Sequence, residues 1–205
     1  MNKELQKNKD VAEFYDAVKR RLFDGDVPLN AARLAYADLC RTLRGFGKND
    51  EKQNIKNEIF SLLKNEYENL TKSRLESAEA FDEWHRMLCD KMKLIFADKH
   101  KFTYGQAQKW INMFLKYMLL ADERLNGMLL WLHIPIDRII TAELKKRRCC
   151  DYLKPYITNE FETWSVLDDY DSYIVLQRKC RELFDSPILT EFRFWNEGKA
   201  PNHVG

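Results

Sequence analysis

The sequence predicts an all-α fold, arranged as a single compact multi-helix domain or as two interleaved helical lobes. Three observations support this prediction. Apolar residues recur at spacings of three and four along most of the 205 residues. No run alternates between apolar and polar residues with the period of two that marks a strand. No internal repeat and no glycine- or serine-rich linker divides the chain, so one domain is the simplest organisation.

Each predicted helix follows an apolar stripe and ends at a turn signal, for example at Asp24-Gly25-Asp26, Gly45-Phe46-Gly47 or Ser186-Pro187. The predicted helices cover residues 11–23, 29–43, a stretch from 51 to about 67, and residues 77–97, 103–120, 136–146, 160–164 and 170–184. Pro135 is predicted in the first turn of the helix from 136. We expect residues 1–9 to fray, residues 189–195 to dock on the core, and residues 196–205 to form a flexible tail.

The overall charge argues against a protein that coats nucleic acid by charge alone. The chain has 34 basic and 32 acidic residues, a formal net charge of +2. Binding to DNA would therefore need a local basic patch. Four clusters are candidates: Lys19-Arg20-Arg21, Arg41/Arg44/Lys48, Lys99/Lys101 and Lys145-Lys146-Arg147-Arg148. Alternatively, such residues complement the dipole at the end of a helix.

Cysteine usage and hydropathy predict a cytoplasmic protein with no membrane span. No apolar leader follows Met1, and no uncharged run reaches the ~18 residues that a membrane helix needs. The five cysteines, including the adjacent Cys149 and Cys150, are expected to be free thiols in a reducing compartment. No CxxC motif occurs, and the aspartates of residues 168–171 are interpreted as helix caps, so we expect neither a metal nor a cofactor.

The predicted helix 103–120 differs from the others because it is apolar on nearly every face, which is typical of a central, buried helix. Its exceptions are Lys109, Asn112 and Lys116, which share one face at i, i+3 and i+7, with Gln108 beside them. Two interpretations remain open. Either this polar stripe faces water, or it lines a cleft where partial burial lowers the pKa of a lysine and frees its amine for nucleophilic attack.

Residues 104–138 resemble part of a known family. Gly105 precedes a helix that carries Lys109, and Ile134-Pro135-Ile136-Asp137 follows it. This arrangement is similar to that of the helix-hairpin-helix DNA glycosylases, nearest the archaeal 8-oxoguanine DNA glycosylase type. The resemblance covers about a quarter of the chain, including a fainter similarity at residues 187–195. The family's hairpin usually has two glycines, whereas Phe102-Thr103-Tyr104-Gly105-Gln106 has one, and the gap of 28 residues between Lys109 and Asp137 is long.

The resemblance implies a glycosylase and AP lyase that acts on a damaged base in double-stranded DNA. Lys109 and Asp137 would be the catalytic pair, with Asp137 also capping the next helix. A flipped base would stack on an aromatic side chain such as Trp110, Trp131 or Tyr104. The backbone that follows Gly105 would hold a phosphate. The implied nucleic-acid-binding residues are Tyr104, Gly105, Gln106, Gln108 and Trp110.

The alternative is a non-catalytic helical interaction or regulatory protein, for example a component of host defence, whose protein partner the sequence does not identify. Lys109 would then be an ordinary surface residue. The two hypotheses differ in one geometric expectation. An enzyme requires the Lys109 amine and the Asp137 carboxylate to converge within a few ångströms at the mouth of a pocket, and an interaction protein does not.

Overall fold

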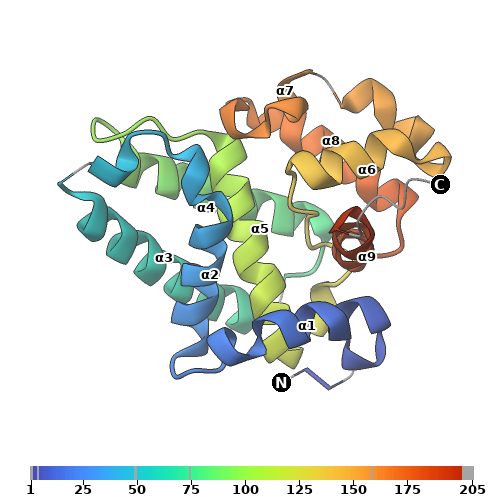
Figure 1. The fold of residues 1–205 in the computed structure, drawn as a ribbon, viewed down its shortest axis with the longest axis horizontal. Helices are drawn as coiled ribbons and strands as arrows, with labels where there is room; N and C mark the ends of the chain where they lie inside the picture. The colour runs from blue at the N-terminus through green and yellow to red at the C-terminus, as the bar shows by residue number, and fades with distance from the viewer. Residues whose placement is uncertain (1, 4, 49, 74, 158, 200–205) are drawn as a thin grey trace.

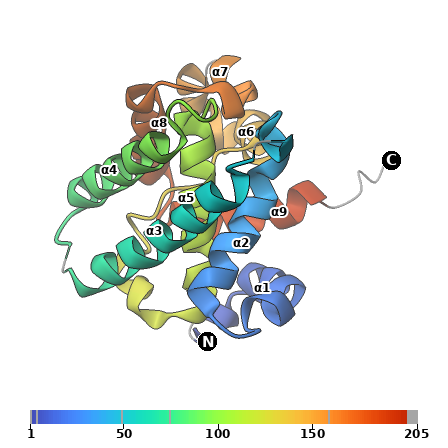
Figure 2. The ribbon, with the colours of Figure 1, turned by 90° about the vertical axis from the view of Figure 1, so that its left-hand side faces the viewer.

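Helix α5 (Tyr104–Ala121) forms the centre of the computed structural model, with α2 and α3 on one side and α6, α8 and α9 on the other (Figure 1). Every residue of α5 from Gly105 to Leu120 is buried. The turned view shows α3 and α4 lying obliquely across α5 (Figure 2). The structure describes residues 1–205 apart from 1, 4, 49, 74, 158 and 200–205. The described residues form one all-α domain without strands, as predicted.

The helices follow the predicted order closely. Their bounds are α1 Lys9–Leu22, α2 Val27–Leu39, α3 Lys52–Lys72, α4 Ala78–Phe96, α5 Tyr104–Ala121, α6 Arg138–Lys146, α7 Asn159–Glu162, α8 Tyr170–Leu183 and α9 Pro187–Lys199. Short 3-10 turns join several of them, at Leu5–Lys7, Cys40–Thr42, Phe46–Lys48, Glu123–Met128, Arg148–Tyr156 and Trp164–Val166.

Capping side chains explain why the central helices begin where they do. Ser77 accepts a hydrogen bond from the Ala80 N–H at the start of α4. Thr103 and Gln106 form a reciprocal capping box at the start of α5. Both helices therefore start within a residue of the predicted positions.

Several predicted boundaries are wrong. The third helix was expected to end near residue 67, but α3 continues to Lys72. The second helix was expected to reach residue 43, but α2 ends at Leu39 and continues as a 3-10 turn. Pro135 was expected in the first turn of a helix from 136, but α6 begins at Arg138 because Asp137 caps it. Pro135 instead lies in a buried non-helical segment ahead of the cap.

The close packing of α2 against α5 depends on small residues. Ala31, Ala32 and Ala35 are fully buried where the two helices meet. The indole N–H of Trp110 donates a hydrogen bond to the Ala32 carbonyl at 3.1 Å, and the side chain has no exposed surface. Trp110 is therefore part of the core that fixes α2 to the central helix.

The chain ends contact the core more than expected. Asn2, within the stretch predicted to fray, is buried, and its backbone N–H donates to the Leu120 carbonyl at 3.0 Å. Helix α9 includes the segment 189–195. Its Phe192 lies against Lys116 of α5 and its Phe194 against Phe184, and both phenylalanines are fully buried. It continues to Lys199, and the remainder of the predicted tail, residues 200–205, lies outside the described residues.

Other sequence predictions concern cysteines, metals and membranes. Cys40 and Cys89 are free thiols, and the side chains of Cys149 and Cys150 lie outside the described part of the chain. Among the described residues, no group of histidine, cysteine, aspartate and glutamate side chains is arranged to hold a metal ion. None of the described helices has the length and apolar character needed to span a membrane.

Candidate active site

The structure brings Lys109 and Asp137 together. The Lys109 Nζ lies 2.6 Å from Asp137 Oδ2. The other carboxylate oxygen, Oδ1, accepts the Ile140 N–H at 2.9 Å and so caps α6. The Lys109 side chain is 5% exposed and that of Asp137 is 15% exposed, so the pair reaches the surface chiefly through the aspartate. One carboxylate therefore both starts a helix and holds the amine.

The charges of this pair correct one expectation from the sequence. Burial alone would lower the pKa of Lys109, but the carboxylates of Asp137 and Glu191 outweigh it, and the pKa is raised. Burial alone would raise the pKa of Asp137, but Lys109 and the Ile140 N–H lower it below its usual value. The pair is therefore an ammonium and a carboxylate at neutral pH, and burial does not free the Lys109 amine in the resting protein.

A second lysine on the same helix is buried even more completely. Lys116 forms an ion pair with Glu191 of α9, and neither side chain has any exposed surface. The Lys116 ammonium lies 3.9 Å from the ring centre of Phe14 and 4.4 Å from that of Phe192. Burial lowers the pKa of Lys116 although Glu191 opposes it, and burial raises the pKa of Glu191 although Lys116 opposes it. Solvent therefore reaches neither group.

Neither interpretation of the polar stripe on α5 matches the structure. The stripe does not face water, because Lys109, Asn112 and Lys116 are all buried. It does not line the cavity of about 450 Å³ described below either. Instead, each stripe residue has a polar partner inside the protein. The stripe is where α6, α8 and α9 attach to the central helix through polar contacts.

Two glutamines hold the segment that leads to Asp137. Gln108 of α5 accepts the Ile136 N–H at 3.1 Å and donates to the Ile136 carbonyl at 2.8 Å. Gln177 of α8 accepts the Ile134 N–H at 3.0 Å and donates to the Ile134 carbonyl at 2.8 Å. Pro135, between the two isoleucines, has no N–H that needs a partner. Side-chain amides thus satisfy a buried non-helical backbone as a neighbouring strand would.

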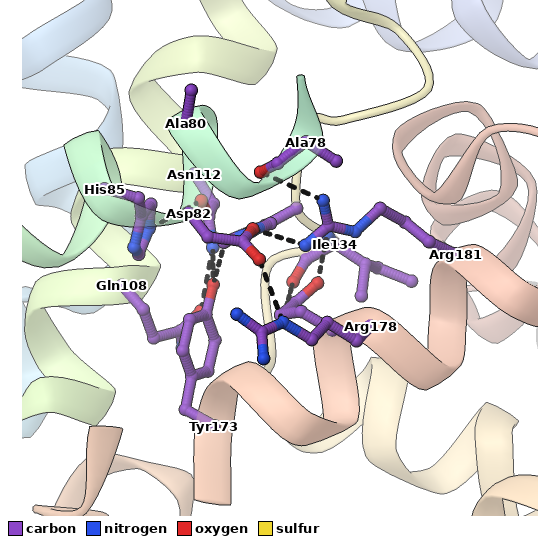
Figure 3. Close-up of polar contacts among 12 residues, drawn as sticks. Ala78, Ala80, Asp82, His85, Gln108, Asn112, Ile134, Tyr173, Arg178 and Arg181 are labelled. Carbon is purple, nitrogen blue, oxygen red and sulfur yellow. Dashed lines mark hydrogen bonds and ion pairs between the residues drawn. The ribbon is translucent and has the colours of Figure 1, made fainter. Parts of the chain in front are cut away.

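A series of buried hydrogen bonds connects Gln108 with residues of α4 and α8 (Figure 3). Asn112 donates to the Gln108 amide oxygen at 3.1 Å and to the Tyr173 hydroxyl at 2.8 Å. The Tyr173 hydroxyl lies 2.9 Å from His133 Nδ1. His85 Nε2 lies 3.1 Å from the Asn112 amide oxygen. The amide that orients Gln108 is therefore itself fixed by α4, α8 and the segment before α6.

This series of hydrogen bonds ends at the buried carboxylate of Asp82. Asp82 of α4 lies 2.9 Å from His133 Nε2, accepts from Arg178 Nε at 3.1 Å, and forms an ion pair with Arg181 (Figure 3). Burial would raise the pKa of Asp82, but His133 and Arg181 lower it to about 2. Burial lowers the pKa of His133 to about 4 although Asp82 opposes it. His133 is therefore neutral at pH 7, and its partners assign the proton to Nε2.

One cavity extends to the residue that follows Asp137 in the chain, although neither Lys109 nor Asp137 is part of its lining. Its volume is about 450 Å³, and its lining includes Arg41, Arg44, Lys101 and Arg138. Arg138 directly follows Asp137 in the chain. Glu162 is the one carboxylate in the lining, and it pairs with Lys145. We call this cavity the basic groove.

The residues around Gly105 are engaged within the protein. The Gly105 N–H donates to the Leu167 carbonyl at 2.8 Å, and a Cβ at this position would lie 1.8 Å from the Trp164 carbonyl oxygen. Glycine is therefore required for the close contact with residues 164–167. The Tyr104 N–H donates to Asp168 at 3.2 Å, and the Tyr104 hydroxyl donates to Asp90 at 2.6 Å.

The other residues that the resemblance assigned to nucleic-acid binding have different surroundings. Gln106 lines the basic groove, although it is only 5% exposed, and it donates to the Thr42 carbonyl at 3.0 Å. The side chain of Gln108 is engaged by the backbone N–H and carbonyl of Ile136. The indole of Trp110 is wholly buried and has no exposed face for a base in this conformation. Of the five residues, Gln106 is the one in the groove lining.

Sequence reasoning found the pair but missed much of what surrounds it. Gln177 and Asp82 carried no motif, and each is followed by a charged residue, Arg178 or Glu83, so no sequence signal set them apart. The basic groove combines members of two clusters noticed in the sequence, Arg41/Arg44 and Lys101, with Arg138. Its position could not be read from the sequence because these residues are far apart along the chain.

No known protein family, no curated protein and no solved structure matches this chain.

Proposed function

We propose that this protein is a DNA base-excision glycosylase and AP lyase that acts on a damaged base through a Schiff base on Lys109. One observation carries the proposal. A buried helix holds a lysine amine 2.6 Å from the carboxylate that caps the next helix, and this carboxylate is the more exposed member of the pair. A lysine beside a carboxylate that accepts its proton is the minimum apparatus of amine nucleophile catalysis.

The proposed reaction begins with proton transfer. The resting Lys109 is an ammonium, so Asp137 first takes a proton from it. The amine then attacks C1′ of the sugar, and the Nζ–C1′ bond forms as the glycosidic C1′–N bond breaks. The electron pair of that bond leaves with the base, which takes the proton from Asp137. Once it has given this proton to the base, Asp137 is again a carboxylate and stabilises the positive charge on the sugar.

Strand cleavage follows from the same covalent adduct. The adduct nitrogen carries two protons after the attack. One of them passes to O4′, and the electron pair it leaves on nitrogen forms the C=N bond of the protonated Schiff base as the C1′–O4′ bond breaks; the other proton stays on the nitrogen. Loss of a proton from C2′ then expels the 3′ phosphate as the C3′–O bond breaks. Hydrolysis of the Schiff base returns Lys109.

Borohydride trapping tests the proposal. The protein is incubated with duplexes that contain 8-oxoguanine or an abasic site, and sodium borohydride reduces the Schiff base to a stable cross-link. We expect a cross-link with the native protein, none with Lys109→Gln, and none with Lys109→Arg, which keeps a cation beside Asp137. Lys91→Gln is the matched control, because Lys91 is half exposed on α4. Unchanged trapping by a folded Lys109→Gln protein would overturn the assignment.

Asp137→Asn separates catalysis from structure. An asparagine also caps a helix well, so α6 should be retained while the proton acceptor is lost. Under the proposal this variant keeps a folded circular dichroism spectrum and loses trapping. If the native protein forms no cross-link with either duplex, the proposal fails, and the pair is structural, as expected for an interaction protein.

A further inference from the structure

We propose that the basic groove binds the sugar–phosphate backbone of a nucleic acid strand through the side chains of Arg41, Arg44, Lys101 and Arg138. The identity of the strand as duplex DNA rests on the proposed function. The assignment of the groove as a binding surface rests on separate observations. These are the positive charge of its lining, the lack of ion pairs to its four cations among the described residues, and the hydrogen bonds that the N–H groups at the start of α5 already make.

The charge of the groove is uncompensated. All four cations are exposed, and none forms an ion pair with the residues that the structure describes. Elsewhere, exposed cations such as Lys64 and Arg86 do have carboxylate partners. The groove carboxylate, Glu162, is occupied by Lys145. A concave surface lined by unpaired positive charge concentrates anions.

The residue types favour a phosphodiester over an acidic peptide. Three of the four cations are arginines, whose planar fork matches phosphate oxygens with two parallel hydrogen bonds. Trp164 and Val166 lie in the same lining, and Val166 is 60% exposed. An exposed apolar side chain among cations fits a ligand that alternates phosphates with apolar sugar faces. A strand in the groove would also pass Arg138, the neighbour of Asp137.

The backbone N–H groups at the start of α5 are not available to bind a phosphate. The N–H groups of Thr103, Tyr104, Gly105 and Gln106 all donate to acceptors within the protein. A phosphate at this point would have to displace those bonds. Side-chain cations, and not hairpin N–H groups, therefore hold the strand in this protein.

Fluorescence anisotropy with a labelled, undamaged DNA duplex of 20 base pairs tests the groove independently of catalysis. We compare the native protein with Arg41→Ala/Arg44→Ala and with Arg138→Ala over a range of salt concentrations. The double variant should bind at least about tenfold more weakly, and each lost phosphate contact should reduce the slope of log K against log salt by about 0.9. These side chains are exposed, so an unchanged melting temperature confirms that the variants fold.

A matched control distinguishes binding through the groove cations from binding through any exposed positive charge. Lys19→Ala/Arg20→Ala removes two exposed cations from α1 and should leave both affinity and salt slope unchanged. Equal losses in this control and in the groove variants would overturn the proposal, as would binding of a polyglutamate peptide without binding of DNA. Groove-dependent binding without trapping would refute the proposed catalysis alone, and trapping without groove dependence would refute the groove alone.

Discussion

The buried Lys116–Glu191 pair gives the sharpest test of the energetics of this fold. Both side chains are fully buried, and α9 supplies the glutamate while α5 supplies the lysine. Replacing Lys116 by methionine keeps the length of the side chain and its contacts with Phe14 and Phe192. It leaves the Glu191 carboxylate buried without its cation. Removing one partner of a buried ion pair typically costs about 3–5 kcal/mol of unfolding free energy.

The double variant Lys116→Met/Glu191→Leu should behave differently. It buries two apolar groups and leaves no charge behind, so its stability should lie near that of the native protein or above it by ~1–4 kcal/mol. The expected order of stability is therefore the double variant first or level with the native protein, and Lys116→Met last. Such an order shows strong coupling between the two positions.

The pH dependence of Lys116→Met follows from the glutamate. Burial raises the folded-state pKa of Glu191 above its unfolded value even with Lys116 present, and removing the lysine removes an opposing influence. A raised carboxyl pKa gives stability that is fully present below the unfolded pKa and is lost as pH rises through the folded pKa. Lys116→Met should therefore be closest to the native protein at acidic pH and fall further behind towards pH 8.

Urea denaturation monitored by circular dichroism at pH 5 and pH 8 measures these differences. A Lys116→Met protein that loses less than ~1 kcal/mol at pH 8 would refute the assumption that the buried carboxylate has no alternative partner or solvent. A double variant as unstable as the single variant would show that the cost came from packing around the aromatic rings, and not from the unpaired charge.

Two further predictions concern the polar network. Gln108→Leu or Gln177→Leu leaves the N–H and carbonyl of one isoleucine unpaired, so each should cost on the order of 1–3 kcal/mol in urea denaturation, whereas an exposed control, Gln53→Leu on α3, should cost little. The folded-state pKa of His133 is about 4, below its unfolded value, so the free energy of unfolding should fall as pH drops from about 6.5 towards 4. His133→Gln should flatten that fall, and a pH profile unchanged by this substitution would contradict the role given to His133.

The all-α fold could be predicted because its signals are local. Apolar spacing located the helices, and capping residues such as Ser77 and Thr103 fixed where they start. The boundary at Asp137 was missed for a specific reason. Proline is common in a first helical turn, but the following aspartate is a stronger cap, and the backbone before it is held by glutamines from other helices.

The surroundings of the candidate site could be predicted only in part, because they depend on contacts between distant residues. The convergence of Lys109 with Asp137 was suggested by resemblance. The burial of the polar stripe was not, since both interpretations treated that face as open. Glu191 lies 75 positions after Lys116, and nothing local to α5 indicates that α9 will cover it. The basic groove has the same origin in tertiary packing.

The two-point attachment of Ile134 and Ile136 has a consequence for how this chain can vary in length. Each glutamine meets both backbone polar groups of one residue, so the segment has a fixed register like that of a paired strand. Losing one residue between 134 and 137 would displace the carboxylate by about 3.3 Å, more than the whole Lys109–Asp137 distance of 2.6 Å. Insertions and deletions are therefore not tolerable in the four residues that follow His133.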